Sequence, residues 1–180
     1  PASLNVSFAQ ASASTITVDY AVTGGTASNG LDYALTSGTL TFPPGATNTN
    51  IFVTITDDAI DEDDETILVT LSNVQYANLG SILTNTYTIT DDDTAHVYFD
   101  IVSQGAWESS TPASFAVSLG LASVYTVTVD YAVTGGTASN GVDYGLIAST
   151  LTFLPGVTNA NISVSITNDI IDEGDETILV

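Results

Sequence analysis

Carboxylate side chains gathered in three short runs are the residues of this chain that could do chemistry. Seven lie within Asp57–Glu65, three form Asp91–Asp93, and five lie within Asp169–Glu176. The chain has no lysine or arginine, so only the single histidine, His96, could offer these carboxylates a basic side-chain partner. Like charges in close contact repel by about 1 kcal/mol per pair even in water. Clusters made only of oxygen donors suit Ca²⁺, which takes about 6–8 oxygen ligands. The runs therefore predict a calcium-dependent protein; the alternative is a solvated acidic loop.

The composition limits the partners that the chain can have. Its formal net charge is −21, which argues against nucleic acid, because proteins hold phosphates mainly through lysine and arginine. No apolar run approaches the roughly 20 residues of a membrane span, so we expect no direct membrane insertion. Cysteine is absent, which removes disulfides and thiol chemistry. With 44% hydrophobic residues the chain can still build a core.

An internal repeat sets the domain organisation. The segment VDYAVTGGTASNG begins at Val18 and recurs unchanged from Val129. Later segments follow at the same spacing, so that DDAIDEDDETILV from Asp57 matches NDIIDEGDETILV from Asn168. The length of the repeat, which is the spacing from Val18 to Val129, is typical of an independently folding domain. We expect two domains, residues 1–93 and 94–180, the first without its first strand and the second without its last strands.

Hydrophobic residues alternate with polar ones along short segments of each repeat. Ile16, Val18, Tyr20 and Val22 point one way in this pattern, and Val97, Phe99 and Ile101 form a later example. Turn residues such as Gly24-Gly25 and Pro43-Pro44-Gly45 separate the segments. The pattern predicts an all-β fold, with an antiparallel β-sandwich of about seven strands in each repeat.

Four motifs in this order resemble the Calx-beta domain family: GTASNGLDY, SGTLTFPPG, DDAIDEDDET, and TYTIT running into Asp91–Asp93. The resemblance covers essentially the whole chain. It implies tandem immunoglobulin-like sandwiches that bind several Ca²⁺ ions at one end. Members of the family occur in the regulatory loop of sodium–calcium exchangers, in an integrin, and in large extracellular and bacterial surface proteins.

The resemblance also implies which residues are calcium ligands. In the first repeat these are Asp32, Asp57, Asp58, Glu62, Glu65, Asp91, Asp92 and Asp93, with the backbone carbonyl of Ile60 as an extra ligand. In the second repeat they are Glu108, Asp143, Asn168, Asp169, Ile171, Glu173 and Glu176. Asn168 stands where the first repeat has Asp57, which predicts weaker binding or fewer ions in the second repeat.

Three hypotheses for the function follow. The first is a calcium-binding structural segment of a long secreted or cell-surface protein, an adhesin or filament that Ca²⁺ stiffens at the domain junctions. The second is a regulatory Ca²⁺-sensor module of a transporter or signalling protein, and the third is a subunit that polymerises by β-strand exchange. The expected partners are neighbouring identical repeats or subunits and a cell-surface or matrix ligand. We expect an extracellular location and no enzymatic activity, because no basic residue or placed histidine could assist catalysis.

Three residues outside the acidic runs complete the expectations. Trp107 is expected to pack in a core or at the domain junction. Asp19 and Asp130 take outward positions on predicted strands, where they are expected to serve solubility alone.

Overall fold

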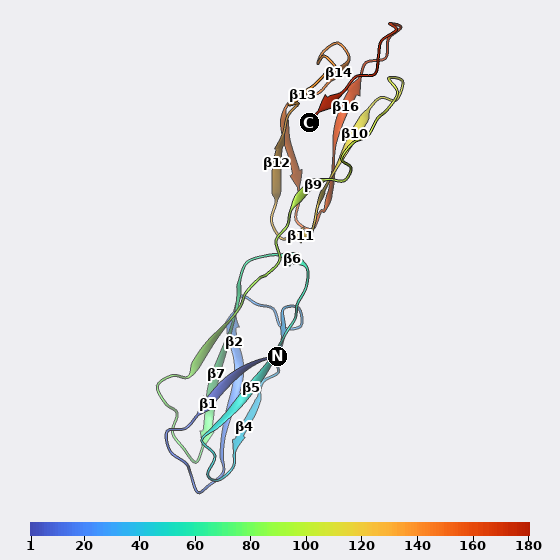
Figure 1. The fold of residues 1–180 in the computed structure, drawn as a ribbon. Coiled ribbons are helices and arrows are strands. Elements are labelled where there is room, and N and C mark those ends of the chain that lie inside the picture. Colours follow the sequence, from blue (N-terminus) through green and yellow to red (C-terminus); the bar gives the residue numbers. More distant parts are fainter. The chain divides into compact units, whose positions relative to one another are not determined.

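The computed structural model describes residues 1–180, and the chain divides into two compact units (Figure 1). The first unit contains residues 1–58 and 63–91, and the second contains residues 59–62 and 92–180. Both are built from strands, as the alternation predicts, and the all-β fold class is confirmed. The structure holds no helix long and apolar enough to cross a membrane.

Seven strands form the first unit, which agrees with the number expected for a repeat. They make a three-stranded sheet in the order β1-β5-β3 and a four-stranded sheet in the order β4-β2-β7-β8. Every strand pair in these two sheets is antiparallel. Their bounds are β1 Ala2–Ser7, β2 Ile16–Gly25, β3 Tyr33–Ala34, β4 Gly38–Phe42, β5 Asn48–Ile55, β7 Glu65–Gln75 and β8 Thr84–Ile89.

The second unit repeats part of this arrangement. One sheet has the order β14-β16-β10-β9, and three smaller pairings join β12 to β15, β13 to β17, and β6 to β11. The β6–β11 pairing is parallel and the others are antiparallel. The bounds are β6 Ile60–Asp61, β9 Val97–Phe99, β10 Ala113–Leu119, β11 Ala122–Ser123, β12 Val127–Tyr131, β13 Gly135–Gly136, β14 Tyr144–Gly145, β15 Ser149–Phe153, β16 Asn159–Ile166 and β17 Ile178–Leu179.

Each unit has its own hydrophobic core, made by the inward residues of the alternating segments. In the first unit Val53 and Ile67 are fully buried, whereas Phe52, which points the other way from β5, is 67% exposed. In the second unit Val164, which matches Val53, and Phe153, which matches the buried Phe42, are fully buried. Side chains alternate between the two faces of a strand, so these strands turn one face inward and the other to solvent.

Three expectations outside the acidic runs are wrong. The alternation of Val97, Phe99 and Ile101 does not continue as a strand, because β9 ends at Phe99 and Ile101 is 58% exposed. Trp107 does not pack in a core, since it is 82% exposed. Asp19 does more than keep the surface soluble.

The Asp19 carboxylate joins three strands of the first unit. It accepts hydrogen bonds from the Thr39 hydroxyl at 2.6 Å and from the Asn73 side-chain amide at 2.8 Å. Asn73 has a positive φ of 46° and lies in β7, where the register with β2 is irregular. The hydrogen bond from Thr39 lowers the pKa of Asp19 most, and the hydrogen bond from Asn73 lowers it further. This carboxylate therefore fixes an irregular stretch of the sheet.

Candidate metal centre

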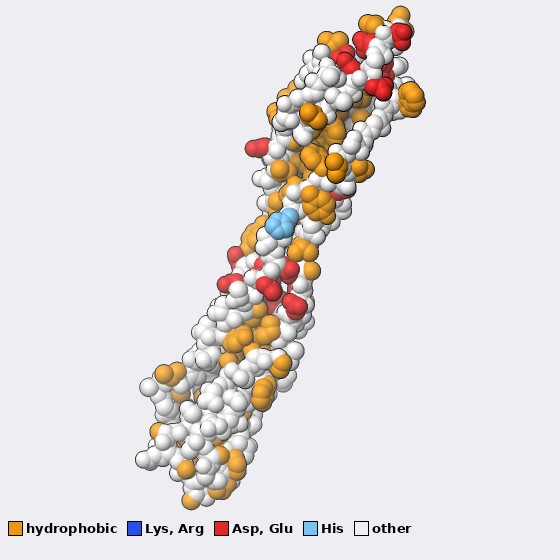
Figure 2. Space-filling view, in the orientation of Figure 1, with side chains coloured by type: hydrophobic (Ala, Val, Ile, Leu, Met, Phe, Trp, Pro, Cys, Tyr) orange, Lys and Arg blue, Asp and Glu red, His pale blue; other side chains and the backbone are white.

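In each repeat a carboxylate from one loop and two carboxylates from the acidic run converge, at positions related by the internal repeat. In the first repeat Asp32, Glu62 and Glu65 each bring one oxygen within 4.8 Å of the other two. In the second repeat Asp143, Glu173 and Glu176 do the same. Figure 2 shows red acidic side chains gathered at the end of the second unit near β14. We call the two sets the first and the second carboxylate cluster.

The loop that carries the first member of each cluster is held by its own side chains. One oxygen of Asp32 accepts the Ser28 amide at 2.6 Å, and one oxygen of Asp143 accepts the Ser139 amide, also at 2.6 Å. The side chain of Asn29 binds the backbone of Leu35 through both its amide nitrogen and its oxygen. The orientation of the aspartate is therefore set before any ligand arrives.

The residue that follows β5, or β16 in the second repeat, anchors the same loop from its other side. The Asp32 carbonyl accepts the amide of Thr56, which follows β5, at 2.9 Å. In the second repeat the Asp143 carbonyl accepts the Thr167 amide at 2.8 Å. These bonds tie the aspartate loop to the start of the acidic run, because Thr56 and Thr167 directly precede the runs at Asp57 and Asn168.

A pair of threonines positions the last member of each cluster. The Thr66 amide, next to Glu65, donates to the Thr26 hydroxyl at 2.9 Å. In the second repeat the Thr177 amide, next to Glu176, donates to the Thr137 hydroxyl at 2.9 Å. The sequence analysis did not identify these threonines, although they lie inside the recurring segments and recur at the same spacing as the acidic residues.

A glycine with positive φ makes room for each threonine pair. Gly25 has φ 120° and Gly136 has φ 124°, values that favour glycine. A Cβ on Gly136 would overlap the Thr177 carbonyl oxygen, and a Cβ on Gly25 would overlap that of Thr66. Both glycines therefore allow a close approach of two strands beside the cluster.

Desolvation and, after it, electrostatic repulsion raise the pKa of two members of the second cluster. Desolvation raises the pKa of Glu173, and the charges of Asp143, Asp169 and Glu108 raise it further. Desolvation also raises the pKa of Glu176. The charges of Asp143 and Glu173, a hydrogen bond with Asp143, and the charge of Glu108 raise it further. The cluster therefore resists carrying its full negative charge in the absence of a cation.

The other expected ligands are not members of the two clusters. Glu108 and Asp169 lie near enough to Glu173 for their charges to affect it. The Asp169 carboxylate accepts the Ile171 amide at 2.7 Å. The remaining expected ligands also lie outside the two sets of three: Asp57, Asp58, Ile60, Asp91, Asp92, Asp93, Asn168 and Ile171.

Asp64 connects the acidic loop of the first repeat to the triplet after β8. Its carboxylate accepts the backbone amide of Asp91 at 3.0 Å. This bond holds the first residue of the triplet beside the loop. Asp64 itself was not among the expected ligands, because no family motif position marked it.

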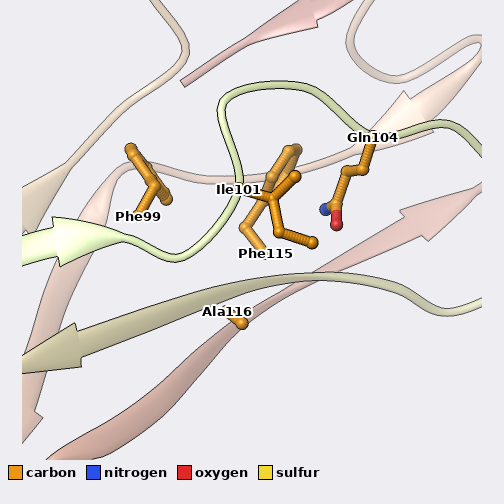
Figure 3. Close-up of a pocket in the computed structure, with 5 residues that line it drawn as sticks. All are labelled: Phe99, Ile101, Gln104, Phe115 and Ala116. Atoms are coloured by element: carbon orange, nitrogen blue, oxygen red, sulfur yellow. The ribbon is translucent and has the colours of Figure 1, made fainter.

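A small notch in the second unit is a packing gap and not a binding site. Phe99, Ile101, Gln104, Phe115 and Ala116 line it, as Figure 3 shows. The Gln104 side-chain amide donates to the Ser114 carbonyl at 2.6 Å, and the rings of Phe99 and Phe115 meet edge to face at 6.3 Å. These contacts hold the segment after β9 against β10.

The donor set of both clusters fits calcium. All three ligands in each are carboxylates, and no nitrogen or sulfur donor accompanies them, which favours a hard cation over zinc or copper. Three carboxylates provide three to six oxygens, and backbone carbonyls and water can complete the roughly 6–8 that Ca²⁺ takes. The first cluster is half-buried and the second is more exposed, which leaves room for water ligands.

The fold and these clusters define a tandem β-sandwich protein with one cluster of three carboxylates per repeat. The chain belongs to the Calx-beta domain family, whose model matches residues 2–93 and 90–180.

Curated relatives include sodium/calcium exchangers. Sodium/calcium exchanger 1 of Canis lupus familiaris is 41% identical over 102 residues, which cover 47% of this chain and 10% of the relative. The same exchanger from Bos taurus is 42% identical over 102 residues. Sodium/calcium exchanger 3 of Homo sapiens is 36% identical over 105 residues, 47% of this chain and 11% of the relative. The match thus spans about a tenth of the length of these relatives.

Solved structures of related tandem domains are also similar. The crystal structure of CBD12 from CALX1.2 is 26% identical, covers 98% of this chain and 72% of that chain, and superposes with a TM-score of 0.49. The crystal structure of the apo form of the Calx CBD1 domain is 33% identical and covers 45% of this chain and 73% of that chain, with a TM-score of 0.43.

Proposed function

We propose that each carboxylate cluster binds Ca²⁺ and that the chain is a calcium-responsive regulatory segment of a larger protein. The observation that carries this proposal is the convergence of three carboxylates, one from the aspartate loop and two from the acidic run, at equivalent places in both repeats. The chain has no lysine or arginine to neutralise them. A divalent cation from solution does so.

The ligands that we propose are the members of the two clusters, completed by neighbours from the acidic runs. In the first repeat Asp32, Glu62 and Glu65 hold the ion, with Asp57, Asp58, Asp91–Asp93 and the Ile60 carbonyl contributing. In the second repeat Asp143, Glu173 and Glu176 hold it, with Glu108, Asn168, Asp169 and the Ile171 carbonyl contributing.

Bound calcium would act on structure through the loops that carry its ligands. Glu65 is the first residue of β7, and Glu176 lies two residues before β17. Neutralising the cluster would remove repulsion at the place where each of these strands begins. Because the ion binds the folded arrangement and not the unfolded chain, it would also stabilise each domain by mass action.

Membership of the Calx-beta family and the similarity to sodium/calcium exchangers support the regulatory alternative over the adhesin or filament. A segment that corresponds to about a tenth of an exchanger could respond to calcium on behalf of the rest of its protein. We propose no catalytic activity for it. The domain boundary between residues 93 and 94, the partners and an extracellular location stay predictions.

Calorimetric titration of the metal-free chain with Ca²⁺, and with Mg²⁺ as a control, tests this proposal. We expect calcium to bind and to raise the melting temperature, and magnesium to do so far more weakly, since it demands a tighter octahedral geometry. A melting temperature that is equal in calcium and in chelator would contradict calcium binding. Calcium binding without any change in backbone amide exchange at β7 and β17 would contradict the regulatory role.

A further inference from the structure

Two Asn-Gly pairs lie in the loops that carry the first aspartate of each carboxylate cluster. Asn29-Gly30 is in the first repeat and Asn140-Gly141 in the second, and no other asparagine of the chain precedes a glycine. In such a pair the backbone nitrogen of the glycine can attack the side-chain carbonyl carbon of the asparagine, because glycine has no side chain that hinders the approach. Both pairs therefore have the chemistry of a modification site.

Both pairs are open to solvent. Asn29 and Asn140 are exposed. Gly30 and Gly141 have φ values of 95° and 88°, and a Cβ at either glycine would meet no heavy atom within 4 Å beyond the adjacent residues. Water, which the modification consumes, can therefore reach the two pairs.

Hydrogen bonds of the folded loop occupy the groups that would react. The Asn29 side chain donates to the Leu35 carbonyl at 2.9 Å and accepts the Leu35 amide at 3.3 Å. The Gly30 amide, whose nitrogen would have to attack, donates to the Tyr33 carbonyl at 2.7 Å. The reaction can therefore start only when the loop opens and these three hydrogen bonds break.

The second repeat makes the same three hydrogen bonds. The Asn140 side chain donates to the Leu146 carbonyl at 2.8 Å and accepts the Leu146 amide at 3.4 Å. The Gly141 amide donates to the Tyr144 carbonyl at 2.7 Å. The same barrier to the reaction is thus built into both repeats.

The loop that holds Asn29 also holds Asp32, so the two residues are released together. The Ser28 amide donates to the Asp32 carboxylate at 2.6 Å, and the Asp32 amide donates to the Ser28 carbonyl at 3.0 Å. Ser28 directly precedes Asn29 in the chain. A cation bound to Asp32 together with Glu62 and Glu65 opposes the opening of this loop, because it binds the closed arrangement.

We propose that Asn29 and Asn140 deamidate when their loops open and that calcium at the carboxylate clusters protects them, a protection that rests on the proposed function. The glycine nitrogen bonds to the side-chain carbon of the asparagine, its proton leaves with the side-chain amide as ammonia, and a five-membered succinimide remains. Water then opens the ring at either carbonyl and gives aspartate or isoaspartate. Isoaspartate adds one carbon to the backbone, which displaces Asp32 from Glu62 and Glu65.

Incubation of the whole chain at neutral pH, in calcium or in chelator, followed by peptide mass spectrometry, tests the protection. We expect Asn29 and Asn140 to deamidate in chelator, and calcium at about 100 times its dissociation constant to slow the reaction about 100-fold. The matched control is Leu79→Gly, which places a glycine after Asn78 in the loop at the opposite end of β7 from Glu65. In that variant Asn78 should deamidate at the same rate in calcium and in chelator.

Calorimetry on the same samples separates this proposal from the proposed function. Calcium that binds but leaves the rates at Asn29 and Asn140 unchanged would overturn the protection alone, whereas absence of binding would overturn both proposals. Two other results would also refute the protection: no deamidation at either asparagine in chelator, or an equal slowing by calcium of Asn78 in the Leu79→Gly variant.

The fully deamidated chain tests the consequence for the calcium site. Its calcium affinity is compared with that of the N29D/N140D double variant, which gains the same charges without the extra backbone carbon. We expect the deamidated chain to bind calcium about tenfold more weakly than the double variant, because the displaced Asp32 no longer reaches the ion. Equal affinities would contradict the displacement.

Discussion

Replacement of Asp143 by asparagine gives the most decisive prediction about the second carboxylate cluster. The variant keeps a neutral oxygen at the same place and removes one of three negative charges. A carboxylate and a divalent cation about 2.4 Å apart attract each other by about 3 kcal/mol even at the dielectric constant of water. The loss is smaller than this, because the substitution also relieves repulsion with two carboxylates whose oxygens lie within 4.8 Å. We expect calcium affinity in the second repeat to fall by about 10- to 30-fold, where each tenfold is about 1.4 kcal/mol.

Fluorescence of Trp107 is a suitable assay, because it is the only tryptophan and lies beside Glu108 in the second unit. Its signal during a calcium titration reports that unit alone, and calorimetry on the same samples gives the affinity. The matched control is Asp130→Asn, which removes the same charge from a strand position where the carboxylate accepts only the Thr150 hydroxyl. If both variants weaken calcium binding equally, the effect is one of net charge, and the assignment of Asp143 as a ligand is refuted.

Three further predictions concern stability. Gly136→Ala should cost about 1–3 kcal/mol because of its positive φ, while Gly105→Ala, in open space, should melt like the natural chain. In the calcium-free protein Glu173 and Glu176 have pKa values above their ordinary 4.5, so the folded state binds more protons than the unfolded chain. The melting temperature should thus rise as the pH falls from neutral toward 4.5, and saturating calcium should remove this trend. The pKa of Asp19 is instead lowered from 3.8 in the folded state. Its contribution to the stability of the fold is therefore present above that pH and is lost as the pH falls below it. Asp19→Asn should make the melting temperature depend less on pH in this acidic range.

The sequence predicted the fold well because the alternation of buried and exposed side chains is a local property. Val53 and Phe52 are neighbours in β5, and their opposite exposure follows directly from the period of two residues. The pattern could not locate where a strand stops. After Phe99 the chain leaves the sheet, and Gln104 instead binds the Ser114 carbonyl. That change depends on a contact with another strand, which no local period records.

Which carboxylates form a cluster depends on which segments lie close together in the folded chain. The sequence alone was less informative about this. It named eight acidic residues of the first repeat as ligands; three of them form the cluster, and the other five stay predicted ligands. Asp32 belongs to it because the Ser28 amide and the Thr56 amide hold its loop against the start of the acidic run. Such positioning comes from backbone hydrogen bonds. The threonine pairs beside Glu65 and Glu176 were missed for the same reason, since their role depends on a cross-strand contact.

Because the two clusters contain the same three residue types, any difference in calcium affinity between the repeats must come from the residues around them. Asn168 replaces Asp57, and Gly174 replaces Asp63, so the second run has two fewer charges in the same span. Desolvation, and after it repulsion from neighbouring carboxylates, raises the pKa of Glu173 and Glu176 in the second cluster. With fewer neighbouring carboxylates, the second repeat attracts a cation less strongly. Its carboxylates also repel each other less, but this effect is smaller, because the ion carries two charges and lies closer to each carboxylate than the carboxylates lie to one another. The first repeat is therefore expected to bind calcium more tightly, so that a rising calcium concentration would fill the two repeats in order.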